Sequence, residues 1–192
     1  MRDYNSVEEL AYEFMSQALL IYQDDISDSE AKSSAINIIC STLFNLNCFS
    51  EENHNTLIAN SMSSCAQLLK KPEQCVAIIN ASNLNNSAFR QDGKKVMDQL
   101  KKGLKICDVC MSSAKNLTLC VDLLNKYLYY YIYEAPFMTA EDINNLLEFI
   151  REHVDGLEDR DSAKEGLVYL ENTKKAIKFK AETNDRLKSI KV

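Results

Sequence analysis

The chain has 192 residues, 22 of them basic and 28 acidic, so its formal net charge is −6. With only 4 glycines and 2 prolines, it lacks the turn residues that an all-β sandwich or barrel needs. Apolar residues make up 46% of the chain, which is enough to build a core and to exclude wholesale disorder, so a mostly helical protein is expected.

Helix-start signals divide the first half of the chain into four expected helices. Ser6 and Ser27 are each followed three residues later by a glutamate, the spacing of a capping box, and Ser50 precedes two acidic residues. Pro72 ends the third helix and fits the first turn of the fourth. Apolar residues at helical spacing follow the first signal, and we expect them to face the core: Val7, Leu10, Ala11, Phe14, Ala18 and Ile21.

A stretch rich in Asn and Ser, residues 82–87, predicts a loop before the second half of the chain. Four more helices are expected over about residues 92–111, 113–134, 139–154 and 162–180. Thr139 and Asp142 have the spacing of a helix cap, and Pro136 closes the helix before them. The remaining residues, 181–192, are expected to form a polar, flexible tail.

The spacing of the expected helices indicates a repeat. Alternate helices start near residues 6, 50, 92 and 139, and two helices per about 40–47 residues is the period of HEAT and armadillo arrays. Short loops make neighbouring helices antiparallel. We predict an all-α, HEAT-like α-solenoid of about four antiparallel helical hairpins, forming one domain over residues 1–180. A single globular bundle of eight helices is the alternative.

The seven cysteines are scattered through apolar stretches, which favours a reduced, cytoplasmic compartment. Cys107 and Cys110 form a C-x-x-C pair near the C-terminal end of an expected helix, the wrong end of the dipole for a thiolate. We favour buried packing of this pair over a role in a thiol enzyme.

The two histidines, His54 and His153, do not have the spacing of metal ligands. No catalytic residue, metal or cofactor is expected, and the acidic balance argues against nucleic acid as a partner.

Five of the nine tyrosines fall within residues 127–133. Tyr127, Tyr130 and Tyr131 share a helix face with neighbouring leucines and are expected in the core. Tyr129 and Tyr133 are four residues apart and form a separate stripe. This stripe fits either packing within the solenoid or binding of a partner, because Tyr combines apolar area with a polar tip.

Charge is segregated along the chain. In an antiparallel array, the loop with Asp24, Asp25 and Asp28 and the loop with Lys70 and Lys71 emerge on the same edge. Opposite patches side by side suit a two-fold contact with a second copy of the chain. The alternative is that Asp28 caps a helix and that the lysines compensate a helix dipole.

A further set of lysines forms either a solvated face or a docking surface for acidic segments or anionic lipid. These are Lys94, Lys95, Lys101, Lys102 and Lys105.

Several short blocks resemble one family in order through most of the chain. They are Tyr12–Ala18, Asp25–Ser29, Cys48–His54, Leu68–Gln74, Gly93–Met97 and Leu100–Lys102. The chain is similar to the C-terminal end of the vacuolar protein sorting-associated protein 35 family, the large α-solenoid subunit of retromer. Members of that family are several times longer. The stretch from Asn83 to Arg90 is shorter than the family pattern, and few identities follow Thr139.

The resemblance implies a non-enzymatic scaffold of a retromer-like coat. In that family, this region wraps the small retromer subunit with a metallophosphoesterase fold and covers its would-be active face. The complex is cytoplasmic and lies on endosomal membranes, so membrane association is indirect, and it retrieves membrane-protein cargo. The C-terminal end also contacts a second large subunit and recruits the actin-nucleating machinery. A free-standing helical adaptor that binds short peptides is the alternative function.

Overall fold

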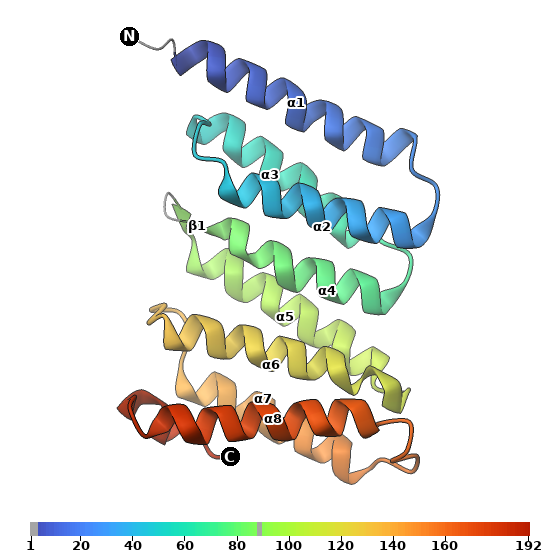
Figure 1. Cartoon of the computed structure of the whole chain (residues 1–192), viewed down its shortest axis with the longest axis vertical. Coiled ribbons are helices and arrows are strands. Elements are labelled where there is room, and N and C mark those ends of the chain that lie inside the picture. The colour runs from blue at the N-terminus through green and yellow to red at the C-terminus, as the bar shows by residue number, and fades with distance from the viewer. Residues whose placement is uncertain (1–3, 88–89) are drawn as a thin grey trace. The chain divides into compact units, whose positions relative to one another are not determined.

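A computed structural model describes residues 4–87 and 90–192, and this part of the chain is helical (Figure 1). Its eight α-helices are α1 (Tyr4–Asp24), α2 (Ser29–Asn45), α3 (Glu51–Ala66), α4 (Lys71–Ala81), α5 (Gly93–Cys110), α6 (Leu117–Ile132), α7 (Ala140–Asp155) and α8 (Lys164–Ala181). Three short 3-10 helices are η1 (Ser82–Asn85), η2 (Ala114–Asn116) and η3 (Asp185–Ser189). The all-α class with antiparallel helices, consistent with an α-solenoid, is confirmed.

The loop predicted over residues 82–87 is instead partly ordered. Residues 82–85 form η1, and β1 (Asn86–Ser87) pairs antiparallel with β2 (Arg90–Gln91). Residues 88 and 89, inside the stretch that is shorter than the family pattern, lie outside the described residues. The third helix also ends earlier than Pro72, at Ala66, while Pro72 lies in the first turn of α4 as predicted.

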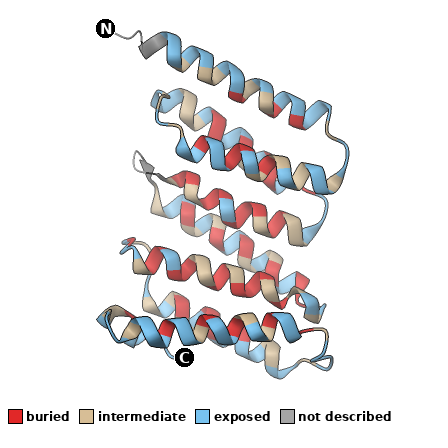
Figure 2. Cartoon of the chain, in the orientation of Figure 1, coloured by how far each residue is buried: buried red, intermediate tan, exposed pale blue. Residues whose placement is uncertain are grey.

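Contacts between helices divide the chain into two compact units, Met1–Gln99 and Leu100–Val192, where one domain over residues 1–180 was expected. In the first unit, α2 packs against α3 and α4, and α4 packs against α3. In the second, α6 packs against α7 and α8. Figure 2 shows the buried residues on the sides of helices that face their neighbours. No helix in the described part of the chain is long and apolar enough to cross a membrane.

The buried face of α1 is not the predicted one. Val7, Leu10, Phe14 and Ile21 are half or more exposed, whereas Met15, Leu19 and Tyr22 are buried. Both sets have helical spacing, so α1 carries two apolar faces. The sequence pattern shows that apolar faces exist, but only the positions of α2 and α3 decide which one is covered.

Helix starts follow the predicted caps at two of four sites. Ser50 accepts from the Asn53 amide, and Thr139 and Asp142 form a complete capping box. At α2, however, Asp28 rather than Ser27 is the cap, accepting from the Ala31 amide at 2.8 Å. Ser6 lies inside α1, because that helix already begins at Tyr4. Asp at an N-cap competes equally with Ser, so the choice between adjacent candidates depends on where the incoming chain turns.

Residues 181–192 are not the expected flexible tail. Leu187 and Ile190 are buried, and the Tyr131 hydroxyl donates to the Arg186 carbonyl at 3.0 Å. Asn144 of α7 binds the segment twice, donating to the Ser189 carbonyl at 3.1 Å and accepting from the Lys191 amide at 2.8 Å. Two apolar residues within a charged segment are therefore enough to hold it when their partners come from α6, α7 and α8.

Candidate interaction surfaces

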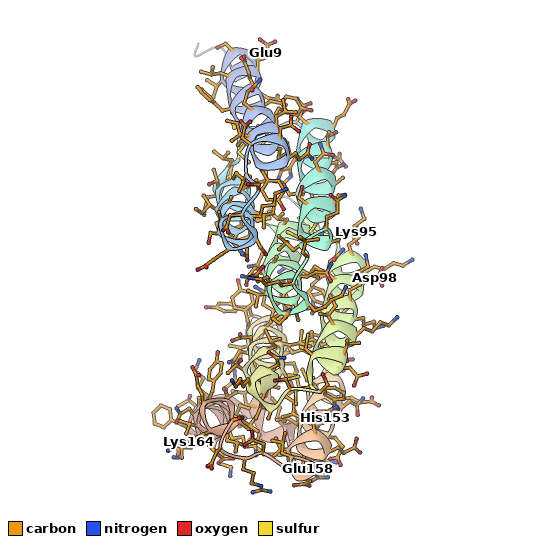
Figure 3. The ribbon with its side chains drawn as sticks, turned by 90° about the vertical axis from the view of Figure 1, so that its right-hand side faces the viewer. Glu9, Lys95, Asp98, His153, Glu158 and Lys164 are labelled. Atoms are coloured by element: carbon orange, nitrogen blue, oxygen red, sulfur yellow. The ribbon has the colours of Figure 1, made fainter. Side chains whose placement is uncertain are left out.

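The cysteines and histidines singled out from the sequence lie in buried positions or form local contacts. Cys107 and Cys110 lie in the last turns of α5 and are both buried. His54 of α3 stacks on Phe49, with ring centroids 6.2 Å apart. His153 of α7, labelled in Figure 3, lies 3.5 Å from Asp108 of α5 through Nε2 and contacts the Phe149 carbonyl through Nδ1. Among the described residues, no three His, Cys, Asp or Glu side chains cluster to hold a metal ion.

The tyrosine cluster of α6 divides into two faces, as helical geometry predicts. Tyr127, Tyr130 and Tyr131 are buried, and burial raises the pKa of Tyr127 to about 12. Tyr129 and Tyr133 are 42% and 73% exposed, and their ring centroids lie 4.8 Å apart. The two exposed rings therefore form a continuous aromatic stripe at the C-terminal end of α6.

This stripe lines a groove of about 330 Å³ between α6, α8 and η3. We call it the tyrosine groove; its lining residues are Asn125, Leu128, Tyr129, Ile132, Tyr133, Thr173, Ala176, Ile177, Lys180 and Leu187. Hydrogen bonds fix the spacing of its two long walls, because Thr173 of α8 donates to Asn125 of α6 at 3.2 Å. Asn125 in turn donates to Tyr169 at 2.8 Å.

A partly buried cation lies beside the tyrosine groove. Lys126 Nζ is 5.3 Å from the ring centroid of Tyr129 and 5.7 Å from that of Tyr130. Burial lowers the pKa of Lys126 to about 8. The ring faces compensate part of the lost hydration of the ammonium group. Sequence reasoning missed Lys126, although it lies three residues before Tyr129 and therefore on the same helix face. It missed the α8 wall because α8 is a separate helix further along the chain.

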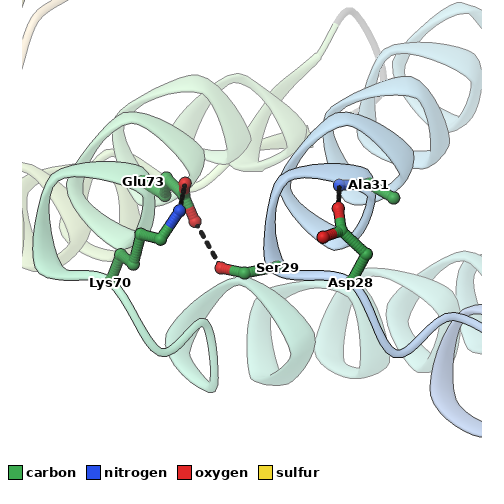
Figure 4. A network of polar contacts seen from close by, with 5 residues as sticks. All are labelled: Asp28, Ser29, Ala31, Lys70 and Glu73. Atoms are coloured by element: carbon green, nitrogen blue, oxygen red, sulfur yellow. Dashed lines mark hydrogen bonds and ion pairs between the residues drawn. The ribbon is translucent and has the colours of Figure 1, made fainter.

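The predicted edge with opposite charges exists within the first unit (Figure 4). Ser29, at the start of α2, donates to Glu73 of α4 at 3.0 Å, and Lys70 Nζ lies 3.1 Å from the other oxygen of Glu73. The hydrogen bond and charge of Glu73 raise the pKa of Lys70. The acidic loop before α2 and the basic loop before α4 therefore lie side by side.

Part of this edge is already used within the chain. Asp28 caps α2, Lys70 pairs with Glu73, and Lys71 donates to Gln74 at 3.0 Å. Capping by Asp28 is confirmed. Lys70 is the N-cap residue of α4, and compensation of the α3 dipole by the lysines stays a prediction. Beside the lysines, Leu69 is 87% exposed. We call the surface formed by Asp24, Asp25, Leu69, Lys70 and Lys71 the charged edge.

The lysines of α5 are only partly balanced by acidic neighbours. Lys95 pairs with Asp92 at 3.2 Å, and Asp98 projects from the same helix (Figure 3). Lys101, Lys102 and Lys105 are exposed. Among the described residues, no ion pair of Lys101, Lys102 or Lys105 is seen, and the two interpretations of this set stay predictions.

Comparison of the sequence with known proteins identifies the family of the chain. The sequence profile described as Vacuolar protein sorting-associated protein 35 matches residues 1–153. The chain belongs to this family. Vacuolar protein sorting-associated protein 35A of Arabidopsis thaliana is 37% identical over 154 residues, covering 75% of this chain and 20% of that protein.

Two other relatives give the same picture. Vacuolar protein sorting-associated protein 35 of Schizosaccharomyces pombe is 34% identical over 161 residues, 80% of this chain and 19% of its own length. Vacuolar protein sorting-associated protein 35C of Arabidopsis thaliana is 32% identical over 191 residues, 93% of this chain and 24% of its own. The chain therefore spans about a fifth of the length of these relatives.

The family match covers the two candidate surfaces unequally. It includes the whole charged edge and the α6 wall of the tyrosine groove, with Tyr129 and Tyr133. It ends before α8 and η3, which supply the other wall.

Proposed function

We propose that the chain is a non-enzymatic scaffold of a retromer-like endosomal sorting coat. It binds the retromer subunit with a metallophosphoesterase fold and supports coat assembly for retrograde transport of membrane-protein cargo from endosomes. It works in the cytoplasm and reaches the endosomal membrane through the rest of the complex. Membership of the vacuolar protein sorting-associated protein 35 family carries this proposal. Stacked helical hairpins support it, because such arrays offer extended surfaces to folded partners.

The tyrosine groove is the proposed contact with the small subunit. Tyr129 and Tyr133 present adjoining rings to solvent, while Ile177 and Leu187 line the groove beneath them. Exposed aromatic side chains over a packed apolar floor are typical of binding hot spots. The polar tips of the two rings remain able to form hydrogen bonds with a partner.

The test replaces both tyrosine rings and compares the loss of binding with that of a control variant in which another exposed aromatic ring is replaced. Tyr129→Ser with Tyr133→Ser should weaken binding of the small subunit about tenfold, in line with the loss of about 1–2 kcal/mol from partly buried anchors. Phe179→Ser is the control, because Phe179 of α8 is as exposed as Tyr133 but does not line the groove. Surface plasmon resonance measures both variants. Wild-type affinity in the double variant, with the helical circular dichroism spectrum unchanged, removes the groove from the interface.

The charged edge is the proposed contact with a second copy of the chain. Asp24 ends α1 and Asp25 follows it, while Lys71 begins α4, so a two-fold axis can bring each patch against its opposite. Leu69 adds an exposed apolar side chain beside them. Exposed ion pairs contribute only about 0–1 kcal/mol each, so the dimer should be weak and sensitive to salt.

Charge reversal followed by sedimentation tests this contact. Lys70→Glu with Lys71→Glu should abolish dimers at low salt, and adding Asp24→Lys with Asp25→Lys should restore part of them. Lys101→Glu with Lys102→Glu makes the same charge change on α5 and should leave dimers intact. A wild-type chain that stays monomeric at high concentration and low salt contradicts the proposal, as do dimers that persist in the first variant.

A peptide adaptor is the competing function, and one observation favours it. A second groove, of about 630 Å³, lies between α7, α8 and the C-terminal residues, with Leu147, Ile150 and Leu170 along its floor. Charged side chains at its rim include Arg151 and Lys174. An adaptor would bind short peptides here and would not bind the small subunit, so the binding experiment above separates the two functions.

A further inference from the structure

Two cysteines from neighbouring helices meet inside the first unit. Cys40 of α2 and Cys65 of α3 have their sulfur atoms 3.8 Å apart. Cys65 is fully buried, and Cys40 is 6% exposed. The two helices pack directly against each other, so the pair bridges the α2–α3 contact.

The two thiols are not equivalent. The hydrogen bond between the two thiols lowers the pKa of Cys40, while the same bond together with burial raises the pKa of Cys65. Cys40 is also the more exposed of the two. Cys40 is therefore the better nucleophile toward a small oxidant, and Cys65 is placed to attack the oxidised sulfur of Cys40.

The surroundings of Cys65 allow the sulfurs to approach. Cys65 lies in the last turn of α3, which ends at Ala66, and helix ends open more readily than helix centres. Ser61 and Ser64 are small buried residues of the same helix, and the hydroxyl of Ser61 has no hydrogen-bond partner among the described residues. A disulfide bond is about 2.05 Å long, so closure needs an approach of about 1.7 Å, within reach of side-chain rotation.

We propose that Cys40 and Cys65 form a hydroperoxide-sensitive dithiol that closes into a disulfide between α2 and α3. The Cys40 sulfur attacks one peroxide oxygen, the O–O bond breaks, and the leaving oxygen takes the Cys40 proton as water or an alcohol. Cys40 is then a sulfenic acid. The Cys65 sulfur attacks the Cys40 sulfur, the S–O bond breaks, and the hydroxyl leaves with the Cys65 proton as water. The two thiols are oxidised and one hydroperoxide is reduced.

The C-x-x-C pair is a poorer site for the same chemistry. Cys107 and Cys110 lie three residues apart on α5, and such positions place their Cβ atoms about 5–6 Å apart. A disulfide needs Cβ atoms about 3.5–4.5 Å apart, so bridging this pair requires the last turns of α5 to distort. Cys40 and Cys65 come from two different helices, and their sulfur atoms already lie 3.8 Å apart.

The bridge would restrain the charged edge. Cys65 lies in the last turn of α3, just before the loop that carries Leu69 and Lys70, and α2 starts directly after the acidic loop. A disulfide closes a long loop and reduces the freedom of the unfolded chain, so oxidation should raise the unfolding temperature. Reduction should return it to its starting value.

Peptide mapping of the unaltered chain tests the proposal. The folded chain is treated with increasing hydrogen peroxide, blocked with N-ethylmaleimide, digested without reduction and analysed by mass spectrometry. The expected product is a linked pair of peptides containing Cys40 and Cys65, lighter by two hydrogens and separated by dithiothreitol. Its appearance should coincide with the rise in unfolding temperature.

Two variants serve as controls. Cys48→Ala removes a partly exposed cysteine outside the pair and should leave the linked peptides in place. Cys40→Ala should eliminate the linked peptides and the temperature rise. The proposal is overturned if Cys40 and Cys65 both remain alkylated as thiols at peroxide levels that oxidise the buried Cys120, or if Cys40 is found linked to a different cysteine.

Discussion

At the scale of single residues, the properties of a side chain depend more on its burial and on how closely its neighbours approach than on its residue type. Lys126 resembles the other lysines of the chain in sequence, yet it lies against two tyrosine rings and its pKa is lowered to about 8 by burial. Gly166 of α8 is a small residue in an otherwise ordinary helix, yet a Cβ atom there would lie 2.7 Å from the Cβ of Leu117. The spacing of Lys126 from Tyr129 and Tyr130 is visible in the sequence, but its burial is not, and nothing in the sequence marks the close approach at Gly166.

Lys126 should give the folded chain an unusual dependence on pH. Its pKa is lower in the folded than in the unfolded state, so between about pH 8 and 10 the unfolded chain holds more protons. Stability from this group therefore rises with pH in that window. Lys126→Met should be more stable at pH 7 by about 1–2 kcal/mol, and the difference from wild type should shrink toward pH 9.5. Urea denaturation at several pH values measures it; a constant difference contradicts the assignment.

Gly166 and Gly156 form a matched pair. Gly166→Ala should destabilise the chain by about 1–3 kcal/mol, because the added methyl overlaps Leu117 where α8 packs against α6. At Gly156 an added methyl meets only backbone oxygens, at 3.5 Å and 3.7 Å. Gly156→Ala should therefore be neutral or stabilising by up to about 1 kcal/mol. Thermal unfolding of both variants provides the comparison, and equal losses would show that α6 and α8 are not in such close contact.

At the scale of elements, several signals whose partner atoms are close in sequence were read correctly, although the caps predicted at Ser6 and Ser27 were not. Thr139 and Asp142 form their capping box within one helical turn, and the phase of Tyr127, Tyr130 and Tyr131 follows from helical geometry alone. The buried face of α1 and the packing of Leu187 were misjudged. Both depend on helices distant in the chain, and Leu187 lies in a segment too short and too charged to show a period.

The reassigned face of α1 predicts opposite results for two large apolar side chains. Leu19 is 5% exposed and Phe14 is 66% exposed. Leu19→Ala should lower the free energy of unfolding by about 2–4 kcal/mol, whereas Phe14→Ser should change it by less than about 0.5 kcal/mol. Denaturant unfolding of the isolated chain distinguishes them. A larger loss at Phe14 would mean that the face first predicted from the sequence is the buried one.

At the scale of the whole molecule, two features of the sequence were enough to predict the fold class and the family. One is the repeat of two helices per about 40–47 residues, and the other is the set of six short blocks that resemble the family. Cys107 and Cys110 are buried, as expected from the sequence, and His153 lies 3.5 Å from Asp108. The surfaces were predicted less completely. Tyr129 and Tyr133 were visible in the sequence, but α8 and η3, which complete their groove, were not.

The central claim is that this chain acts by binding a folded partner through its helical surface. Isothermal titration calorimetry of the unaltered chain against the metallophosphoesterase-fold retromer subunit tests it most directly. The account predicts saturable 1:1 binding whose enthalpy becomes more negative with rising temperature, the sign of buried apolar surface. No saturable heat at any temperature, with both proteins folded and at concentrations of about 100 μM, would contradict it.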